Sequence, residues 1–305
     1  MNCAPMIKEI GRGAKGARSL ERDAAATLFG GMLDGSVADL ELGAILIALR
    51  IKSESLDELL GFKQAMDAQG AQLVVPDGPR CVVLPSYNGA RRQPNLMPLV
   101  AMLLARDGVP VLIQGRHDFE SRVSPFELLA ALGITPASDT AEAGAQLASR
   151  HLTCLQVSTL LPGLDRLLSL RPRMGVRSSA HTMAKLLDPC RGRSVRVVAV
   201  THPEYLERMD EFLRADGGRA MLLRGTEGEI YANPRRCPEM KTYADGTGQT
   251  GVAGEEGGAP PLAGLPDSPS IADNVTTIRA MLSGEQPVPA PIVAQVRALK
   301  ALALD

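Results

Sequence analysis

Apolar positions in the first 70 residues recur every three or four residues, which is the spacing of helices with one buried face. The pattern predicts a helix over 19–33, with Ser19 as its N-cap, a second helix beginning after Asp39, and a third over 55–69. A short glycine-rich basic arm over 6–18 precedes them. We therefore expect an all-helical N-terminal domain, which we place at residues 1–75.

From Cys81 onward, short apolar runs alternate with longer helical stretches, and this alternation predicts an α/β domain with a largely parallel sheet. We place this domain at 76–305, with a mobile loop rich in glycine and proline at 244–270. The expected strands cover 81–86, 109–113, 154–158, 195–200 and 219–223, and the expected helices cover 94–106, 125–132, 162–170, 180–187, 204–215, 271–283 and 289–303.

The stretch 84–134 has the layout of a substrate-binding unit, in which strands and helices are joined by loops that hold the ligand. In open α/β sheets, ligands bind at the loops that follow the carboxyl ends of the strands. The loops expected in that position are 85–93, 114–124, 158–162, 201–203 and 224–229.

Composition narrows the classes of function. The 305 residues are 45% hydrophobic and 22% charged with a net charge of −1, which is typical of a globular protein and gives no global attraction to nucleic acid. With no Trp, four Tyr and five Phe, base stacking on aromatic platforms is disfavoured. The five scattered cysteines are expected as reduced thiols in or near the core. The chain shows neither a secretory leader nor a run of about 18 apolar residues, so we expect a cytoplasmic protein without a membrane partner.

Basic residues are nevertheless concentrated in one part of the chain. Residues 150–196 hold nine Lys or Arg but only two acids, Asp165 and Asp188. Such a concentration favours a groove for a polyanion, although dispersed, solvated arginines or a site for a small anion are alternatives. His117 and His181 are expected near the same groove, and no sequence neighbour suggests a catalytic dyad for either.

Several segments resemble a known family in the same order along the chain. DLELGAILIALRIKSESLDELLGFKQAM (39–66), IQGRHDFESRVSPFELLAALGI (113–134) and MGVRSSAHTMAKLLDP (174–189) resemble anthranilate phosphoribosyltransferase and its nucleoside phosphorylase relatives, glycosyltransferase family 3. The resemblance implies a small helical domain, a larger α/β domain, and a homodimer joined through the helical domain. IKEIGRGAKGAR, LPSYNGARRQPNLMPL and RGTEGEIYANPRR resemble a divergent bacterial branch that includes a protein binding DNA without sequence preference.

The sequence departs from the enzymes of this family at the residues that hold the phosphoribosyl donor. Their G-T-G-G-D loop corresponds here to residues 85–89, and their N-x-S-T turn has become Asn95-Leu96-Met97-Pro98, which lacks the hydroxyls. Gln114 replaces a lysine. The resemblance leaves a substrate-pocket remnant consisting of Ser86, Tyr87, Asn88, Gly89, Asn95 and Gly115.

We therefore expect binding of DNA or RNA through arginines, without catalytic residues and without a required cofactor. The alternative is a glycosyl- or phosphoribosyltransferase that uses a phosphoribosyl pyrophosphate-like donor with an altered acceptor, with magnesium at Glu227 and Glu229. A regulatory protein that senses a small anion is a third interpretation. The residues expected to bind nucleic acid are Lys15, Arg91, Arg92, Arg116, Arg122, Arg171, Arg173, Arg177, Lys185, Arg191 and Arg193.

Overall fold

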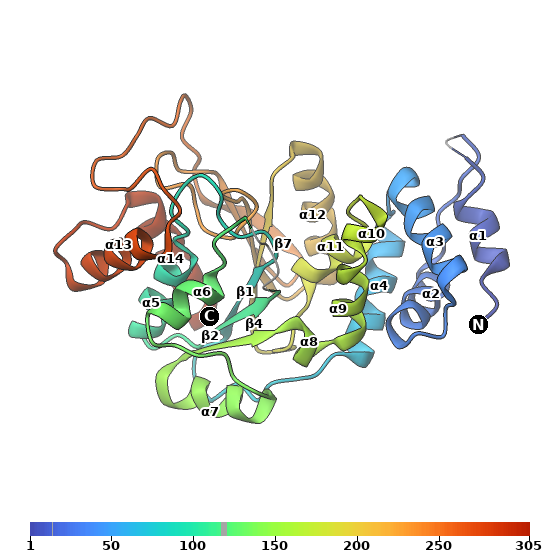
Figure 1. Cartoon of the computed structure of the whole chain (residues 1–305), viewed down its shortest axis with the longest axis horizontal. Helices are drawn as coiled ribbons and strands as arrows, with labels where there is room; N and C mark the ends of the chain where they lie inside the picture. Colours follow the sequence, from blue (N-terminus) through green and yellow to red (C-terminus); the bar gives the residue numbers. More distant parts are fainter. Residues whose placement is uncertain (14, 117–120) are drawn as a thin grey trace. The chain divides into compact units, whose positions relative to one another are not determined.

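The computed structural model describes residues 1–13, 15–116 and 121–305, and the chain forms two compact units (Figure 1). The helical unit consists of Met1–Ala71 and Val157–Pro189, and the α/β unit consists of Gln72–Gln156 and Cys190–Asp305. The sequence predicted one domain boundary near residue 75. It did not indicate that residues 157–189 pack with the N-terminal helices. This packing is close, because a Cβ atom at Gly163 would lie 2.0 Å from the carbonyl oxygen of Leu33.

The helical unit follows the predicted periodicity, with one correction at its start. Residues 4–10, which overlap the arm expected over 6–18, form a helix, and the next helix begins at Arg22 instead of residue 19. The backbone N–H of Leu20 donates to the buried carboxylate of Glu58 at 2.9 Å, which holds this part of the chain extended. The helices are α1 (Ala4–Ile10), α2 (Arg22–Asp34), α3 (Asp39–Lys52), α4 (Leu56–Gln69), α8 (Val157–Leu160), α9 (Pro162–Ser169), α10 (Arg171–Met174) and α11 (Ser179–Met183), followed by a 3-10 turn at Ala184–Leu186.

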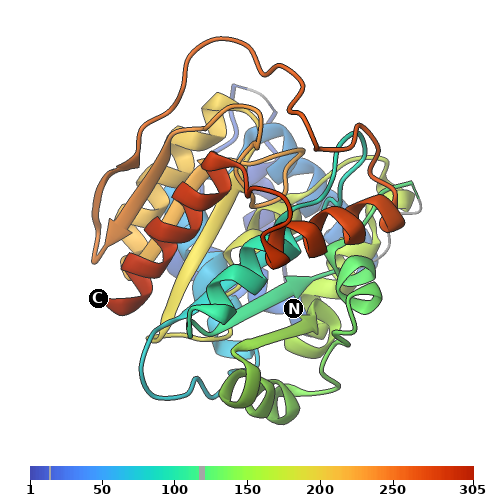
Figure 2. The same cartoon turned by 90° about the vertical axis from the view of Figure 1, so that its left-hand side faces the viewer.

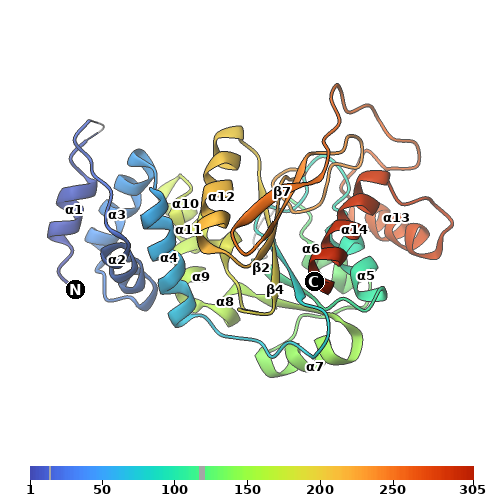
Figure 3. The ribbon, with the colours of Figure 1, turned by 180° about the vertical axis from the view of Figure 1, so that it is seen from behind.

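The α/β unit is built on a seven-stranded sheet in the order β3-β2-β1-β4-β5-β6-β7. The five strands from β3 to β5 are parallel, and β6 and β7 add an antiparallel edge, seen from behind in Figure 3. This confirms the predicted α/β class and the mostly parallel sheet. The strands are β1 (Cys81–Ser86), β2 (Val111–Gly115), β3 (Leu152–Gln156), β4 (Ser194–Val200), β5 (Arg219–Arg224), β6 (Met240–Ala244) and β7 (Thr247–Val252).

Central strands of this sheet are buried on both faces, which is why they appear in the sequence as continuous apolar runs. Along β4, Val195 and Val197 belong to the core shared with α5 and α14, whereas Arg196, on the opposite face, pairs with Asp216 at the end of α12. Figure 2 shows the C-terminal helices beside α5. The helices of this unit are α5 (Met97–Arg106), α6 (Pro125–Ala131), α7 (Thr140–Arg150), α12 (Pro203–Asp216), α13 (Ile271–Ser283) and α14 (Ala290–Leu304).

Several predicted segments differ from the structure, including the strand expected at 154–158, which lies at Leu152–Gln156. The expected loop 244–270 begins with a strand, β7, which pairs with β6. The predicted loop 158–162 is largely helical, because α8 starts directly after β3. The helix expected from residue 94 begins at Met97, after a loop in which the Pro94 carbonyl accepts a hydrogen bond from Tyr231.

The five cysteines are buried, as the sequence predicted, and none of them forms a disulfide bond. Burial raises the pKa of the Cys154 thiol to about 12, so this thiol stays protonated and unreactive. Among the described residues, no helix is both long and apolar enough to cross a membrane.

The hairpin of β6 and β7 is attached to α12 by the carboxylate of Asp210. This carboxylate accepts hydrogen bonds from Tyr243 Oη at 2.6 Å, Arg214 Nε at 2.7 Å and Lys241 Nζ at 3.2 Å. Burial alone would raise the pKa of Asp210, but the hydrogen bonds from Arg214, Tyr243 and Lys241 outweigh burial and lower the pKa to about 2.

We predict that Asp210→Asn lowers the free energy of unfolding by about 1 kcal/mol at neutral pH, a figure that allows for solvent screening. Because the folded pKa of Asp210 is below its unfolded value, its contribution is complete above about pH 4 and disappears as the pH falls toward 2. Urea denaturation from pH 7 to pH 3 measures this, and the difference from the unmodified chain should narrow below pH 4. A difference that stays constant with pH would contradict the assignment.

Candidate functional site

The candidate site lies where the strand order reverses, at the carboxyl end of β1. The chain runs from β1 outward to β2 and β3 on one side, and from β4 to β5 on the other. Such switch points are the usual ligand sites of open α/β sheets. Two segments meet here: the loop 86–92, which we call the β1 loop, and the turn 225–229, which we call the β5 turn.

The centre of the site is the carboxylate of Glu229, whose residue is fully buried. It accepts hydrogen bonds from the backbone N–H groups of Asn88 at 2.9 Å and Gly89 at 2.8 Å, and from Ser86 Oγ at 2.7 Å. Converging backbone N–H groups and a hydroxyl at a loop are the donors that proteins use to hold a phosphate. In this chain, the protein's own carboxylate receives them.

The second carboxylate of the β5 turn binds the next part of the β1 loop. Glu227 accepts hydrogen bonds from the backbone N–H groups of Arg91 and, at 3.0 Å, Arg92. Gly228 between the two acids has a φ of +89°, and a Cβ atom there would lie 2.7 Å from Asn88 Nδ2. That amide nitrogen donates to the Gly228 carbonyl at 3.0 Å. The glycine therefore lets the turn approach the loop closely enough for both acids to bind it.

Neighbouring residues fix the β1 loop from its other side. Ala90 and Val123 exchange two backbone hydrogen bonds of 2.8 Å, and Arg122 donates to the Asn88 carbonyl at 3.1 Å. Gly89 has a φ of +67° and packs against Arg122 and Val123. The loop is therefore held on both sides by residues of the same compact unit.

The remaining pocket residues have structural partners. Tyr87 donates to the buried Gln114 side chain, and a Cβ atom at Gly115 would lie 1.9 Å from the Ser86 carbonyl oxygen. The side chain of Asn95 accepts from the Met97 N–H at 3.1 Å, so it supports the start of α5. The substrate-pocket remnant predicted from the sequence is thus brought together, with its hydrogen bonds directed into the protein.

Burial, and then the charges of Glu227 and Glu229, raise the pKa of Tyr231 well above its ordinary value. Its phenol stays neutral and donates to the Pro94 carbonyl at 2.8 Å, which anchors the end of the same loop region. Nothing in the sequence pattern marked Tyr231 for this role, because its partner lies 137 positions away.

The predicted basic residues fall into both units and differ in their contacts. In the α/β unit, Arg91 and Arg92 are exposed, and their guanidinium groups bind no described residue. Arg116 is half-buried, and Arg193 is used internally because it donates to the carbonyls of Pro76 and Gly78 at 2.9 Å each. Arg191, also in this unit, is half-buried.

In the helical unit, Arg173 and Arg177 are exposed around α10, while Arg171 and Lys185 are half-buried. Lys15 is exposed near the N-terminus. The two sets belong to different compact units, so the groove expected between them stays a prediction.

Of the two histidines expected near the groove, the structure describes only His181. His117 lies outside the described residues. His181 Nδ1 accepts the Ser178 N–H at 3.2 Å in a capping box at the start of α11.

The predicted magnesium pair does not have the surroundings of a cation site. Magnesium prefers an octahedron of oxygen ligands, whereas the carboxylates of Glu227 and Glu229 face N–H and O–H donors. In the described part of the chain, no group of three His, Cys, Asp or Glu side chains could hold a metal ion. The resemblance to the family's enzymes implied these acids as the magnesium pair, and in the structure both bind the β1 loop.

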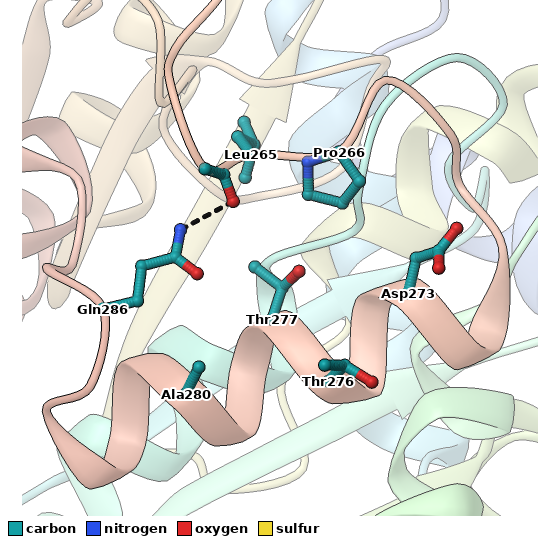
Figure 4. Close-up of a pocket in the computed structure, with 8 residues that line it drawn as sticks. Leu265, Pro266, Asp273, Thr276, Thr277, Ala280 and Gln286 are labelled. Atoms are coloured by element: carbon teal, nitrogen blue, oxygen red, sulfur yellow. Dashed lines mark hydrogen bonds between the residues drawn. The ribbon is translucent and has the colours of Figure 1, made fainter.

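A separate pocket of about 470 Å³ lies beside α13 in the α/β unit (Figure 4). Thr277, Thr276 and Asp273 line it from the helix, and Gln286 closes one side by donating to the Gly264 carbonyl at 2.7 Å. None of the residues predicted for nucleic-acid binding lines this pocket.

Comparison with known proteins supports the resemblance. Residues 4–70 match the helical bundle domain of a glycosyl transferase family. A protein of Escherichia coli K12 named "Uncharacterized protein YbiB" is 43% identical over 301 residues, covering 97% of this chain and 92% of that protein. Anthranilate phosphoribosyltransferase of Beijerinckia indica is 26% identical over 298 residues, covering 92% of this chain and 82% of that enzyme.

Several solved structures share the fold, and two of them illustrate the similarity. Anthranilate phosphoribosyltransferase of Thermus thermophilus matches with a TM-score of 0.76 at 22% identity, covering 97% of this chain and 87% of that one. The Saccharomyces cerevisiae enzyme, solved in complex with PRPP and Mg, matches with a TM-score of 0.75 at 13% identity, covering 98% and 88%. The chain belongs to the anthranilate phosphoribosyltransferase-like proteins of glycosyltransferase family 3.

Proposed function

We propose that this chain binds the phosphate backbone of nucleic acid without sequence preference and uses the phosphoribosyltransferase scaffold for that purpose. The observation that carries the proposal is the carboxylate of Glu229 within the β1 loop. A phosphoribosyl donor would need the same N–H groups, so donor binding requires this buried carboxylate to leave. The two arginines that follow in the loop remain available to solvent.

Arg91 and Arg92 are suited to this role because their backbone is fixed while their side chains are exposed. Glu227 holds both backbone N–H groups, and neither guanidinium group has a partner among the described residues. Two adjacent arginines on a fixed loop contact phosphates without reading bases, which gives affinity with little sequence discrimination. Arg173 and Arg177 on the helical unit could contribute further phosphate contacts.

The alternative function is transfer of a phosphoribosyl group to an unidentified acceptor. It is favoured by the family and by relatives named anthranilate phosphoribosyltransferase at 26% identity over most of the chain. In this alternative, the β5 turn moves aside when the donor binds, and the β1 loop donors then hold its pyrophosphate. The regulatory interpretation corresponds to donor binding without turnover.

We also propose that two copies associate through the helical unit. Along α3, Leu40, Ile47 and Ile51 are 82%, 39% and 69% exposed and follow one face of the helix. Ile47 and Ile51 line an apolar pocket of about 290 Å³ together with Ile7 and Ile10 of α1. Exposed apolar faces of this kind are typical of protein contacts, and a second copy would double the number of basic residues.

The first prediction concerns the arginines of the β1 loop. Replacing Arg91 and Arg92 together with alanine should weaken binding of a duplex DNA of random sequence by roughly tenfold or more. The slope of log affinity against log salt is negative, and its magnitude should decrease by about 2, because roughly 0.9 counterions are released for each phosphate contact. Fluorescence anisotropy at several salt concentrations measures both quantities.

The matched control removes two exposed arginines from other parts of the same unit, Arg279 and Arg297. Its affinity and salt slope should stay close to those of the unmodified chain. Absence of DNA binding by the unmodified chain at low salt, or binding that salt does not weaken, would overturn the proposed function.

The second prediction distinguishes the proposed function from phosphoribosyl transfer. Isothermal calorimetry with phosphoribosyl pyrophosphate and magnesium should give no saturable heat for the unmodified chain. Saturable binding that depends on magnesium and disappears in Glu227→Ala would establish the transferase interpretation instead.

The third prediction concerns association. Ile47→Glu with Ile51→Glu should convert a dimer into a monomer, because charged side chains would have to be buried at the contact. Light scattering after size-exclusion chromatography measures the mass. Val74→Glu, at an 80% exposed apolar position of the α/β unit, is the control and should leave the mass unchanged. A monomeric unmodified chain would rule out this contact.

A further inference from the structure

The β1 loop has the donors of a phosphate site but is already filled. Asn88 and Gly89 supply consecutive backbone N–H groups, and Ser86 supplies a hydroxyl, all to one carboxylate. Ser86 and Asn88 are 2% and 4% exposed, so water cannot readily replace that carboxylate as their acceptor. The loop in this conformation therefore requires a buried acceptor, which in this chain is a carboxylate.

The β5 turn delivers this anion by its own backbone structure. The Glu229 N–H donates to the Thr226 carbonyl at 2.9 Å, and Thr226 Oγ1 donates to the Tyr231 carbonyl at 2.9 Å. A Cβ atom at Gly225 would lie 2.0 Å from the carbonyl oxygen of Glu229, so the turn is also tightly closed. The carboxylate thus comes from a preformed turn whose own hydrogen bonds are satisfied, which distinguishes it from a freely rotating surface acid.

We propose that Glu229 is a built-in substitute for a phosphate group. It positions the β1 loop and excludes small phosphate esters from it, so that free nucleotides and sugar phosphates do not compete there. The selection of polymeric over small phosphates rests on the proposed function, whereas the occupation of the loop by an internal anion does not. Removal of this side chain should expose a site for a small oxyanion such as acetate or phosphate.

Glu229→Ala tests the proposal by chemical rescue. In chloride buffer the midpoint of thermal unfolding should fall by roughly 5 °C, because buried donors lose their acceptor. Acetate or phosphate at about 100 mM, compared with chloride at equal ionic strength, should restore roughly 2 °C or more, because the added anion binds only the folded state. The unmodified chain should show no saturable response to acetate, and it should gain from phosphate only the general stabilisation that this anion gives to folded proteins.

Glu229→Gln is the matched control. Its amide fills the same space and lacks the negative charge, so it should be destabilised but not rescued by either anion. Glu227→Ala should also show no rescue, because Glu227 binds the exposed end of the loop, at Arg91 and Arg92.

Three results would overturn the proposal: a Glu229→Ala variant as stable as the unmodified chain, equal responses of Glu229→Ala and Glu229→Gln to the anions, or a saturable stabilisation of the unmodified chain by acetate beyond chloride. The last result is measured on the unmodified chain, so it remains informative if the alanine variant does not fold. None of these measurements uses nucleic acid, so failure here and failure of the proposed function are distinguishable.

Discussion

Backbone N–H groups that are buried at the end of β1 need an acceptor, and the carboxylate of Glu229 supplies it. The conformation of the β1 loop follows from this interaction. With Glu227 bound to the next two N–H groups, the loop follows the β5 turn closely along its length, and Gly228 permits the approach. The exposed guanidinium groups of Arg91 and Arg92 then start from a fixed backbone. One loop thus binds a carboxylate inside the protein and then carries two exposed arginines at its surface.

The positive charge that a ligand can reach depends on which arginines already bind groups within the protein, because many arginines stabilise the fold. Arg166 donates to the Met32 carbonyl at 2.6 Å, and Arg196 pairs with Asp216. Arg193 holds the carbonyls of the segment that leads into β1. The excess of basic residues at 150–196 therefore overstates the charge available to a ligand. Exposed arginines that no described residue binds lie in both units, with Arg91 and Arg92 in one and Arg173 in the other.

Local sequence patterns predicted the helices and strands well. They could not predict contacts between residues that lie far apart in the chain. Strand β4 is an apolar run because both of its faces are buried, so its sequence identifies it without knowledge of its neighbours. The helices of 157–189 would have the same periodicity in either unit. Only packing such as that of Gly163 on Leu33 determines that they join the helical unit. Glu229 and Asn88 are 141 positions apart. The family resemblance suggested Glu227 and Glu229 as a metal pair, and the sequence does not show that each acid faces hydrogen-bond donors.

Retention of a family residue is therefore weak evidence for retention of its activity. Asn95 matches the family pattern, yet in this chain it accepts the Met97 N–H and donates its amide to the Val123 carbonyl at 3.2 Å. Its own backbone N–H is held by Asn274 at 2.8 Å. These contacts support the start of α5 and would favour asparagine even without a ligand. The same reasoning applies to Gly115, whose close approach to Ser86 leaves no room for a side chain. A scaffold can thus keep the residues that once framed a substrate because the fold depends on them, while a buried carboxylate takes the place of the phosphate.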